Sequence, residues 1–234
     1  MAISKPNAPL IDTIGDNTTD TGDIIYNRYA SSFWKVRSAS KAIDFIVRHY
    51  KVDMRKVVVF GYSEGALVAP RLAVYNKKVT HCIGFVGGGL NQLFDDVIKN
   101  SISAQKGDIS QQKAQQKIDE LYINYEDIYS NPGAVTKFWH GHSYLRWSSY
   151  TNTPTIAFYK KLNIPVYIAQ GTNDENTSIL STDYIKLEFL RLHKTNLTYK
   201  VYPDCDHFFN NANTGQNDMD KIIDEAFKWL DNSQ

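Results

Sequence analysis

The segment VVVFGYSEGALVA, residues 57–69, gives the clearest indication of the fold. Its apolar, β-branched start is typical of a strand buried on both faces of a parallel sheet. The small and aliphatic residues after Gly65 are typical of a helix packed against that strand. Gly61, Ser63 and Gly65 form a G-x-S-x-G pattern between them, in which a strained turn projects the serine hydroxyl above the sheet and the two glycines let neighbouring backbone approach. Ser63 is therefore the candidate nucleophile.

On both sides of this stretch, short strand-like runs alternate with helical patterns. The runs expected as strands are residues 56–60, 79–86, 165–169 and 197–202. Apolar residues at helical spacing predict helices around residues 39–47, 182–192 and 219–230. This alternation predicts an α/β fold with a mostly parallel sheet.

A serine hydroxyl needs a histidine to take its proton, and the histidine needs an acid to fix its tautomer. Asp174 follows the expected strand 165–169, and His207 follows the strand 197–202. Open α/β sheets place their ligands beyond the carboxyl ends of the strands, so both positions suit these roles. Ser63, Asp174 and His207 are thus the expected catalytic residues, with Glu175 and Asp183 as the alternative acids.

Residues 91–154 interrupt the alternation of strands and helices. They begin after three glycines with a polar segment whose expected helix places Ala114, Ile118, Leu121 and Tyr122 on one side. A stretch rich in aromatic residues follows, without an obvious strand. We interpret residues 91–154 as a helical cap insertion within a single domain of residues 1–234.

A cap over a site commonly sets its specificity. We therefore expect Tyr62, Trp139, Tyr144 and Trp147 to contact the substrate, with Arg146 as a further candidate. The same aromatic side chains can equally anchor the insertion to the rest of the chain. The insertion suggests a substrate with an apolar or aromatic portion.

Two other reactive groups are weaker candidates. His140 and His142 stand at strand-like spacing but have no Cys, Asp or Glu beside them as a third metal ligand, so no metal or cofactor is expected. Cys205 lies two residues before His207 but has no elbow or helix N-terminus to activate a thiolate. The serine therefore remains the expected nucleophile.

From residue 57 to its end, the chain resembles the serine α/β-hydrolase superfamily. The elbow around Ser63, the aspartate in Gln-Gly-Thr-Asn-Asp and the histidine in Pro-Asp-Cys-Asp-His recur there in this order. The chain looks most similar to the dienelactone-hydrolase-like and prolyl-oligopeptidase-like acyl hydrolases. The resemblance implies a three-layer α/β-hydrolase sheet, the triad of Ser63, Asp174 and His207, and the backbone N–H of Glu64 as one oxyanion donor.

The resemblance also implies strands and an oxyanion loop before the nucleophile. No segment before Ser63 reads as that loop, and residues 2–10 are the one strand expected there. We therefore expect the N-terminal strands of the fold to be missing here, or supplied in another way, for example by a partner.

Composition and charge exclude several classes of binding partner and indicate a cellular location. Lys and Arg together number 26 and Asp and Glu 25, so a net charge of +1 provides no field that would attract nucleic acid or an anionic membrane. Two cysteines, Cys82 and Cys205, cannot build a disulfide framework. No apolar run is long enough to span a bilayer, and residues 1–30 show no signal-peptide pattern, so a cytoplasmic location is the default expectation. A homo-oligomer stays open.

The expected activity is hydrolysis of carboxylic esters or thioesters through an acyl-enzyme on Ser63, with a small ester or acyl compound as substrate. Two alternatives stay open. One is a peptidase of the prolyl-oligopeptidase type. The other is a non-catalytic binding or scaffold protein, which the missing oxyanion loop favours.

Overall fold

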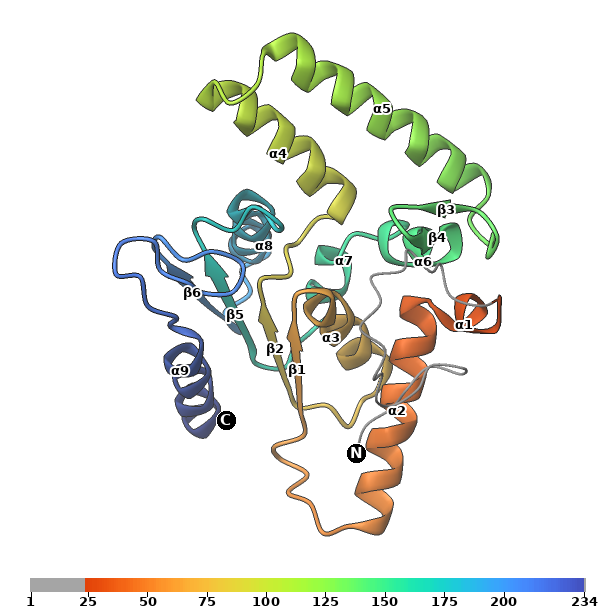
Figure 1. Cartoon of the computed structure of the whole chain (residues 1–234). Coiled ribbons are helices and arrows are strands. Elements are labelled where there is room, and N and C mark those ends of the chain that lie inside the picture. The colour runs from red at the N-terminus through yellow and green to blue at the C-terminus, as the bar shows by residue number, and fades with distance from the viewer. Residues whose placement is uncertain (1–23, 234) are drawn as a thin grey trace.

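The computed structural model describes residues 24–233, and four parallel strands form its main sheet (Figure 1). Their order is β1-β2-β5-β6, and every neighbouring pair is parallel. The four strands are β1 (Val58–Tyr62), β2 (His81–Phe85), β5 (Val166–Gly171) and β6 (Leu197–Tyr202). All four lie where the sequence predicts strands, so the expected α/β fold with a mostly parallel sheet is confirmed.

Helices cover both faces of this sheet. The helices that join or flank the strands are α1 (Ile24–Tyr29), α2 (Ser32–His49), α3 (Glu64–Tyr75), α7 (Ile156–Tyr159), α8 (Ile179–Arg191) and α9 (Met219–Asn232). The helix expected at 182–192 begins earlier, at Ile179, because the Ser178 side chain caps it by accepting a hydrogen bond from the Leu180 N–H.

The core is divided between the two faces by the alternation of side chains along each strand. On β2, Cys82 packs with helices α2, α3, α7 and α8, whereas Ile83 packs with α9 on the opposite face. On β5, Ile168 and Tyr167 divide in the same way. The molecule therefore has three layers, and the carboxyl ends of all four strands meet at one edge of the sheet.

Residues 91–154 contain two long helices, a short hairpin and a further helix. These elements are α4 (Gln92–Lys106), α5 (Gln111–Ser130), β3 (Phe138–Trp139), β4 (His142–Ser143) and α6 (Tyr144–Thr151). Helices α4 and α5 pack on each other and extend away from the sheet beyond the carboxyl ends of its strands (Figure 1). The hairpin was not predicted, because two-residue strands leave no periodic pattern in a sequence.

The buried side of α5 differs in part from the expected one. Ala114 and Ile118 are buried as predicted, but Tyr122 is 53% exposed, and Tyr125 and Ile128 are buried in its place. A helical face drifts around the axis over five turns, so the contacting side moves toward later positions. The strand expected at residues 2–10 lies outside the described residues.

Candidate active site

Ser63 occupies the sharp turn between β1 and α3. Its backbone has φ 52° and ψ −117°, a conformation that L-residues rarely adopt and that costs free energy unless the surroundings hold it. A Cβ at Gly61 would lie 2.2 Å from the carbonyl oxygen of Gly65, so only glycine fits at position 61. A Cβ at Gly65 would meet no described atom within 4 Å, so the expected need for close approach holds at Gly61 and not at Gly65.

The structure brings Ser63, His207 and Asp174 into one chain of contacts. Nε2 of His207 lies 2.9 Å from Oγ of Ser63, and Nδ1 lies 2.9 Å from Oδ2 of Asp174. The three residues come from the turn after β1 and from the loops after β6 and β5. These loops meet because parallel strands end at the same edge of the sheet.

The Asp174 carboxylate is buried and fully hydrogen-bonded. Oδ1 accepts the backbone N–H groups of Asn176 and Thr177, both at 2.8 Å. Oδ2 accepts the side-chain amide of Gln170 at 3.1 Å besides its contact with His207. Four partners hold the carboxylate in one orientation, which in turn orients the imidazole.

Tyr62 contacts His207 and is not one of the residues that line the cavity. Its hydroxyl donates a 2.5 Å hydrogen bond to the backbone carbonyl of His207, and the two rings lie 5.6 Å apart. Burial and the nearby carboxylates of Asp174 and Asp206 raise the pKa of Tyr62 to about 12, so its hydroxyl stays a donor. The expected contact with substrate is thus replaced by a contact that fixes the histidine loop.

A cavity of about 220 Å³ opens in front of Ser63. Its walls come from the elbow, from helices α4 and α6, and from the loops after β2, β5 and β6. The lining residues are Ser63, Glu64, Leu67, Gly87, Gln92, Asp95, Arg146, Tyr150, Asn176, Thr177 and His207. Most of the lining residues have polar side chains, and Glu64, Asp95 and Arg146 are charged.

Glu64, the residue after Ser63, organises one side of this cavity. Its carboxylate contacts the ammonium of Lys35, Nη2 of Arg146 at 2.9 Å and the hydroxyl of Tyr150 at 2.5 Å. Burial alone would raise the pKa of Glu64, but the charge of Arg146 and the hydrogen bonds from Lys35 and Tyr150 lower it to about 2. Its backbone N–H stands in the first turn of α3, where helix N–H groups lack intrahelical partners and favour negative charge.

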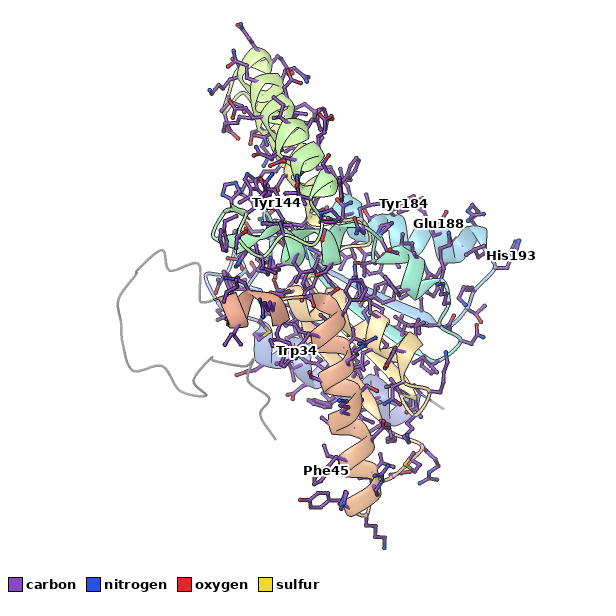
Figure 2. The ribbon with its side chains drawn as sticks, turned by 90° about the vertical axis from the view of Figure 1, so that its right-hand side faces the viewer. Trp34, Phe45, Tyr144, Tyr184, Glu188 and His193 are labelled. Carbon is purple, nitrogen blue, oxygen red and sulfur yellow. The ribbon has the colours of Figure 1, made fainter. Side chains whose placement is uncertain are left out.

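Trp139, Tyr144 and Trp147 pack together in a hydrophobic cluster within residues 91–154 and are not among the cavity-lining residues, which corrects the expected substrate contacts. The indole N–H of Trp147 donates to the carbonyl of Trp139 at 2.7 Å. The Tyr144 hydroxyl donates to Asp127 at 2.8 Å, and Figure 2 shows Tyr144 at the foot of the two long helices. Arg146, also on α6, does line the cavity.

The alternative site residues lie outside the triad. Asp183 accepts a hydrogen bond from Tyr199, and Glu175 lies 3.7 Å from Lys99 at the surface. The Cys205 thiol is buried, and burial raises its pKa. Between residues 24 and 233, no three His, Cys, Asp or Glu side chains cluster in a way that could hold a metal ion.

Seven of the cavity-lining residues were not predicted: Leu67, Gly87, Gln92, Asp95, Tyr150, Asn176 and Thr177. Gln92 and Asp95 share one face of α4, at a spacing of three. A usable signal was present, because α4 begins after the carboxyl end of β2, the edge where α/β folds collect their ligands. Asn176 lies in the Asp174 loop itself.

Comparison with known families and structures agrees with this geometry. Residues 38–212, well over half of the chain, match the family described as BAAT / acyl-CoA thioester hydrolase C terminal. The chain belongs to this family. This membership confirms the resemblance to the α/β hydrolases seen in the sequence. No curated protein matches the sequence significantly.

Solved structures confirm the fold of this family member. Dipeptidyl peptidase 4 from Porphyromonas gingivalis superposes with a TM-score of 0.58 at 12% identity, over 91% of this chain and 25% of its own. The α/β hydrolase GrgF from Penicillium sp. sh18 gives a TM-score of 0.55 at 10% identity, over 87% of this chain and 72% of its own. A structure from Klebsiella pneumoniae subsp. pneumoniae, provisionally assigned as a dienelactone hydrolase, gives 0.51 at 11% identity, over 86% and 61%.

The chain spans about a quarter of the length of the peptidase structures it resembles. At these identities the superpositions speak for the fold and not for a substrate. Among the described helices, none combines the length and apolar character needed to cross a bilayer.

Proposed function

We propose that this chain is a serine acyl hydrolase that cleaves carboxylic esters or thioesters through an acyl-enzyme on Ser63. The observation that carries the proposal is His207, whose two ring nitrogens lie 2.9 Å from Ser63 Oγ and 2.9 Å from Asp174 Oδ2. A histidine held in this way can take a proton from the serine and return it to a leaving group. The thioester hydrolase family supports the choice of acyl substrates.

In the acylation step, His207 Nε2 takes the Ser63 proton while Oγ attacks the substrate carbonyl carbon. The carbonyl electrons move to oxygen, and the N–H of Glu64 in the first turn of α3 stabilises that oxyanion. Asp174 keeps the Nδ1 proton on the imidazole and stabilises its positive charge. The tetrahedral intermediate then expels the alcohol or thiol, which takes the proton from Nε2.

Water completes the cycle by the same route. His207 takes a proton from a water molecule, whose oxygen attacks the acyl carbon, and Ser63 Oγ leaves with the proton from Nε2. The products are the free acid and the restored hydroxyl. The helices and hairpin of residues 91–154 act in this proposal as a cap, because α4 and α6 contribute Asp95 and Arg146 to the cavity wall.

A fluorophosphonate probe tests the proposal, since it phosphonylates only an activated serine. We expect labelling of the wild-type protein, none of Ser63→Ala, and unchanged labelling of Ser101→Ala, a matched control on α4 outside the cavity. Short p-nitrophenyl esters and acyl thioesters should be hydrolysed in the same pattern. A folded wild-type protein that is not labelled would favour a non-catalytic scaffold, and faster cleavage of small amides than of esters would favour a peptidase.

A further inference from the structure

Asp95 on α4 is a carboxyl group placed where the active-site cavity meets a second cavity. Among the described residues, it is the one side chain that lines both the cavity at Ser63 and a cavity of about 380 Å³ beside it. The second cavity lies between α4 and the loop that follows β5. A molecule bound at Ser63 and extending into the second cavity would therefore pass Asp95.

The Asp95 carboxyl is buried without a full set of partners. The residue is only 7% exposed, and its Oδ1 has no hydrogen-bond partner within the described part of the chain. Buried polar atoms are normally hydrogen-bonded, and one without a partner in a cavity wall calls for a specific explanation. Burial raises the pKa of Asp95 to about 7, although hydrogen bonds from Ser181 and from the Ser178 backbone act in the opposite direction.

The other charged residues that line the active-site cavity are already paired. Glu64 forms an ion pair with Arg146, and Asp174 forms one with His207. Lys99, one turn further along α4, lies 3.7 Å from Glu175 and is half exposed. Asp96 and Asp174 add negative charge near Asp95, and within residues 24–233 no lysine, arginine or histidine forms an ion pair with its carboxyl.

We propose that Asp95 is a specificity-determining residue that binds an ammonium group of the substrate within the active-site cavity. This inference rests on the proposed hydrolase function and adds a substrate class to it. A protonated amine supplies both the positive charge and the N–H donor that the buried Oδ1 lacks, and charge-assisted hydrogen bonds are the strong ones. An uncharged substrate would leave the carboxyl as it is, so the ammonium compound gains relative binding free energy.

The test compares substrates that differ only by an ammonium group in place of a carbon. For the acyl side the pair is p-nitrophenyl 3-aminopropanoate and p-nitrophenyl butanoate. For the leaving group it is 2-(dimethylamino)ethyl butanoate and 3-methylbutyl butanoate. In the wild-type protein near pH 7.5 we expect kcat/KM for one ammonium compound to exceed that of its isostere about tenfold or more.

Asp95→Asn keeps the size of the side chain and removes its charge. We expect the ammonium preference, the ratio of kcat/KM for the two compounds of a pair, to fall to about twofold or less in Asp95→Asn. Asp96→Asn removes a neighbouring charge that does not line the active-site cavity and should keep the preference. Absence of any ammonium preference in the wild-type protein, or its survival in Asp95→Asn, would overturn the inference.

Labelling of Ser63 separates this inference from the proposed function. If the probe labels the wild-type protein and no ammonium preference exists, only the role of Asp95 fails. If Asp95→Asn does not fold, the wild-type protein provides the test. Propylammonium should then slow fluorophosphonate labelling of Ser63 at concentrations at which 1-propanol does not. Equal effects of the two compounds on the labelling rate overturn the inference. If the wild-type protein is not labelled, calorimetric binding of propylammonium decides, with binding supporting the ammonium site and no binding overturning it.

Discussion

Replacement of Arg71 by methionine should both destabilise the protein and disturb the cavity wall. Arg71 lies on α3 and is 6% exposed. Its guanidinium donates to the carbonyls of Ser149 at 2.7 Å, Tyr150 at 2.7 Å and Thr153 at 3.0 Å, and to the hydroxyl of Ser32 at 2.9 Å. One buried side chain thus connects the end of α6 and the start of α2 to α3, the helix that follows Ser63.

The magnitude follows from two opposing effects. Hydrogen bonds from a charged donor contribute about 1.5–3 kcal/mol each. Burial opposes them, because it lowers the pKa of Arg71 from 12.5 to about 10, which corresponds to roughly 3 kcal/mol. Methionine keeps the apolar packing but leaves buried carbonyls without donors. We expect the free energy of unfolding to fall by about 3–5 kcal/mol, as for other broken buried charge networks, and Tm by about 6–20 °C.

Urea denaturation followed by circular dichroism measures this loss. Arg55→Met is the matched control, because Arg55 pairs with Asp53 at the surface, and we expect its unfolding midpoint to be unchanged. Tyr150 lines the cavity, so displacement of α6 should also slow fluorophosphonate labelling of Arg71→Met under conditions where it is folded. A loss of stability below about 1 kcal/mol would refute the reasoning that these four hydrogen bonds outweigh the cost of burying the charge.

Three further outcomes follow from individual side chains. Burial in the folded state raises the pKa of Asp95 to about 7, so the folded protein binds this proton more tightly than the unfolded chain does. The free energy of unfolding of the wild type, relative to that of Asp95→Asn, should therefore decrease by about 2–4 kcal/mol between pH 4 and a pH above 7. Urea denaturation at both pH values measures this difference. A constant difference would contradict it. Trp147→Ala should lower the free energy of unfolding by about 3–5 kcal/mol, because Trp147 is buried in the hydrophobic cluster of residues 91–154. The preference among p-nitrophenyl esters should stay the same. An altered preference would indicate that Trp147 contacts the substrate. Asp174→Asn should reduce kcat by about 10³–10⁴ with a native circular dichroism spectrum, and near-normal turnover would exclude Asp174 as the acid that orients His207.

The local sequence pattern was sufficient to predict the four strands of the main sheet and the chain order of Ser63, Asp174 and His207. Strand β1, the turn at Ser63 and helix α3 are consecutive, so their local pattern predicts them without any long-range contact. The loops that carry Asp174 and His207 each follow an apolar strand, and parallel strands must end at the same edge of a sheet. Adjacency along the chain was enough to predict which side chains would meet there.

The walls of the cavity depended on the tertiary structure. Trp139, Tyr144 and Trp147 look like pocket residues because they are large and aromatic, yet they fill the core of the insertion. Composition cannot distinguish the inner from the outer side of a helix whose partner is another part of the same insertion. On α6, Trp147 turns inward and Arg146, its neighbour in the chain, turns to the cavity.

The burial of the Asp95 carboxyl could not be predicted from the sequence. In the sequence Asp95 is one of two adjacent aspartates at the start of a polar helix, where a solvated position is the ordinary expectation for a carboxyl group. Burial arises because α4 leaves the sheet edge and passes beside the loop that holds Asp174, a contact between segments far apart in the chain. The local sequence pattern thus determines which side chains follow the strand ends. The charge of a side chain such as Asp95 depends on its desolvation, and desolvation depends on all the segments that pack around it.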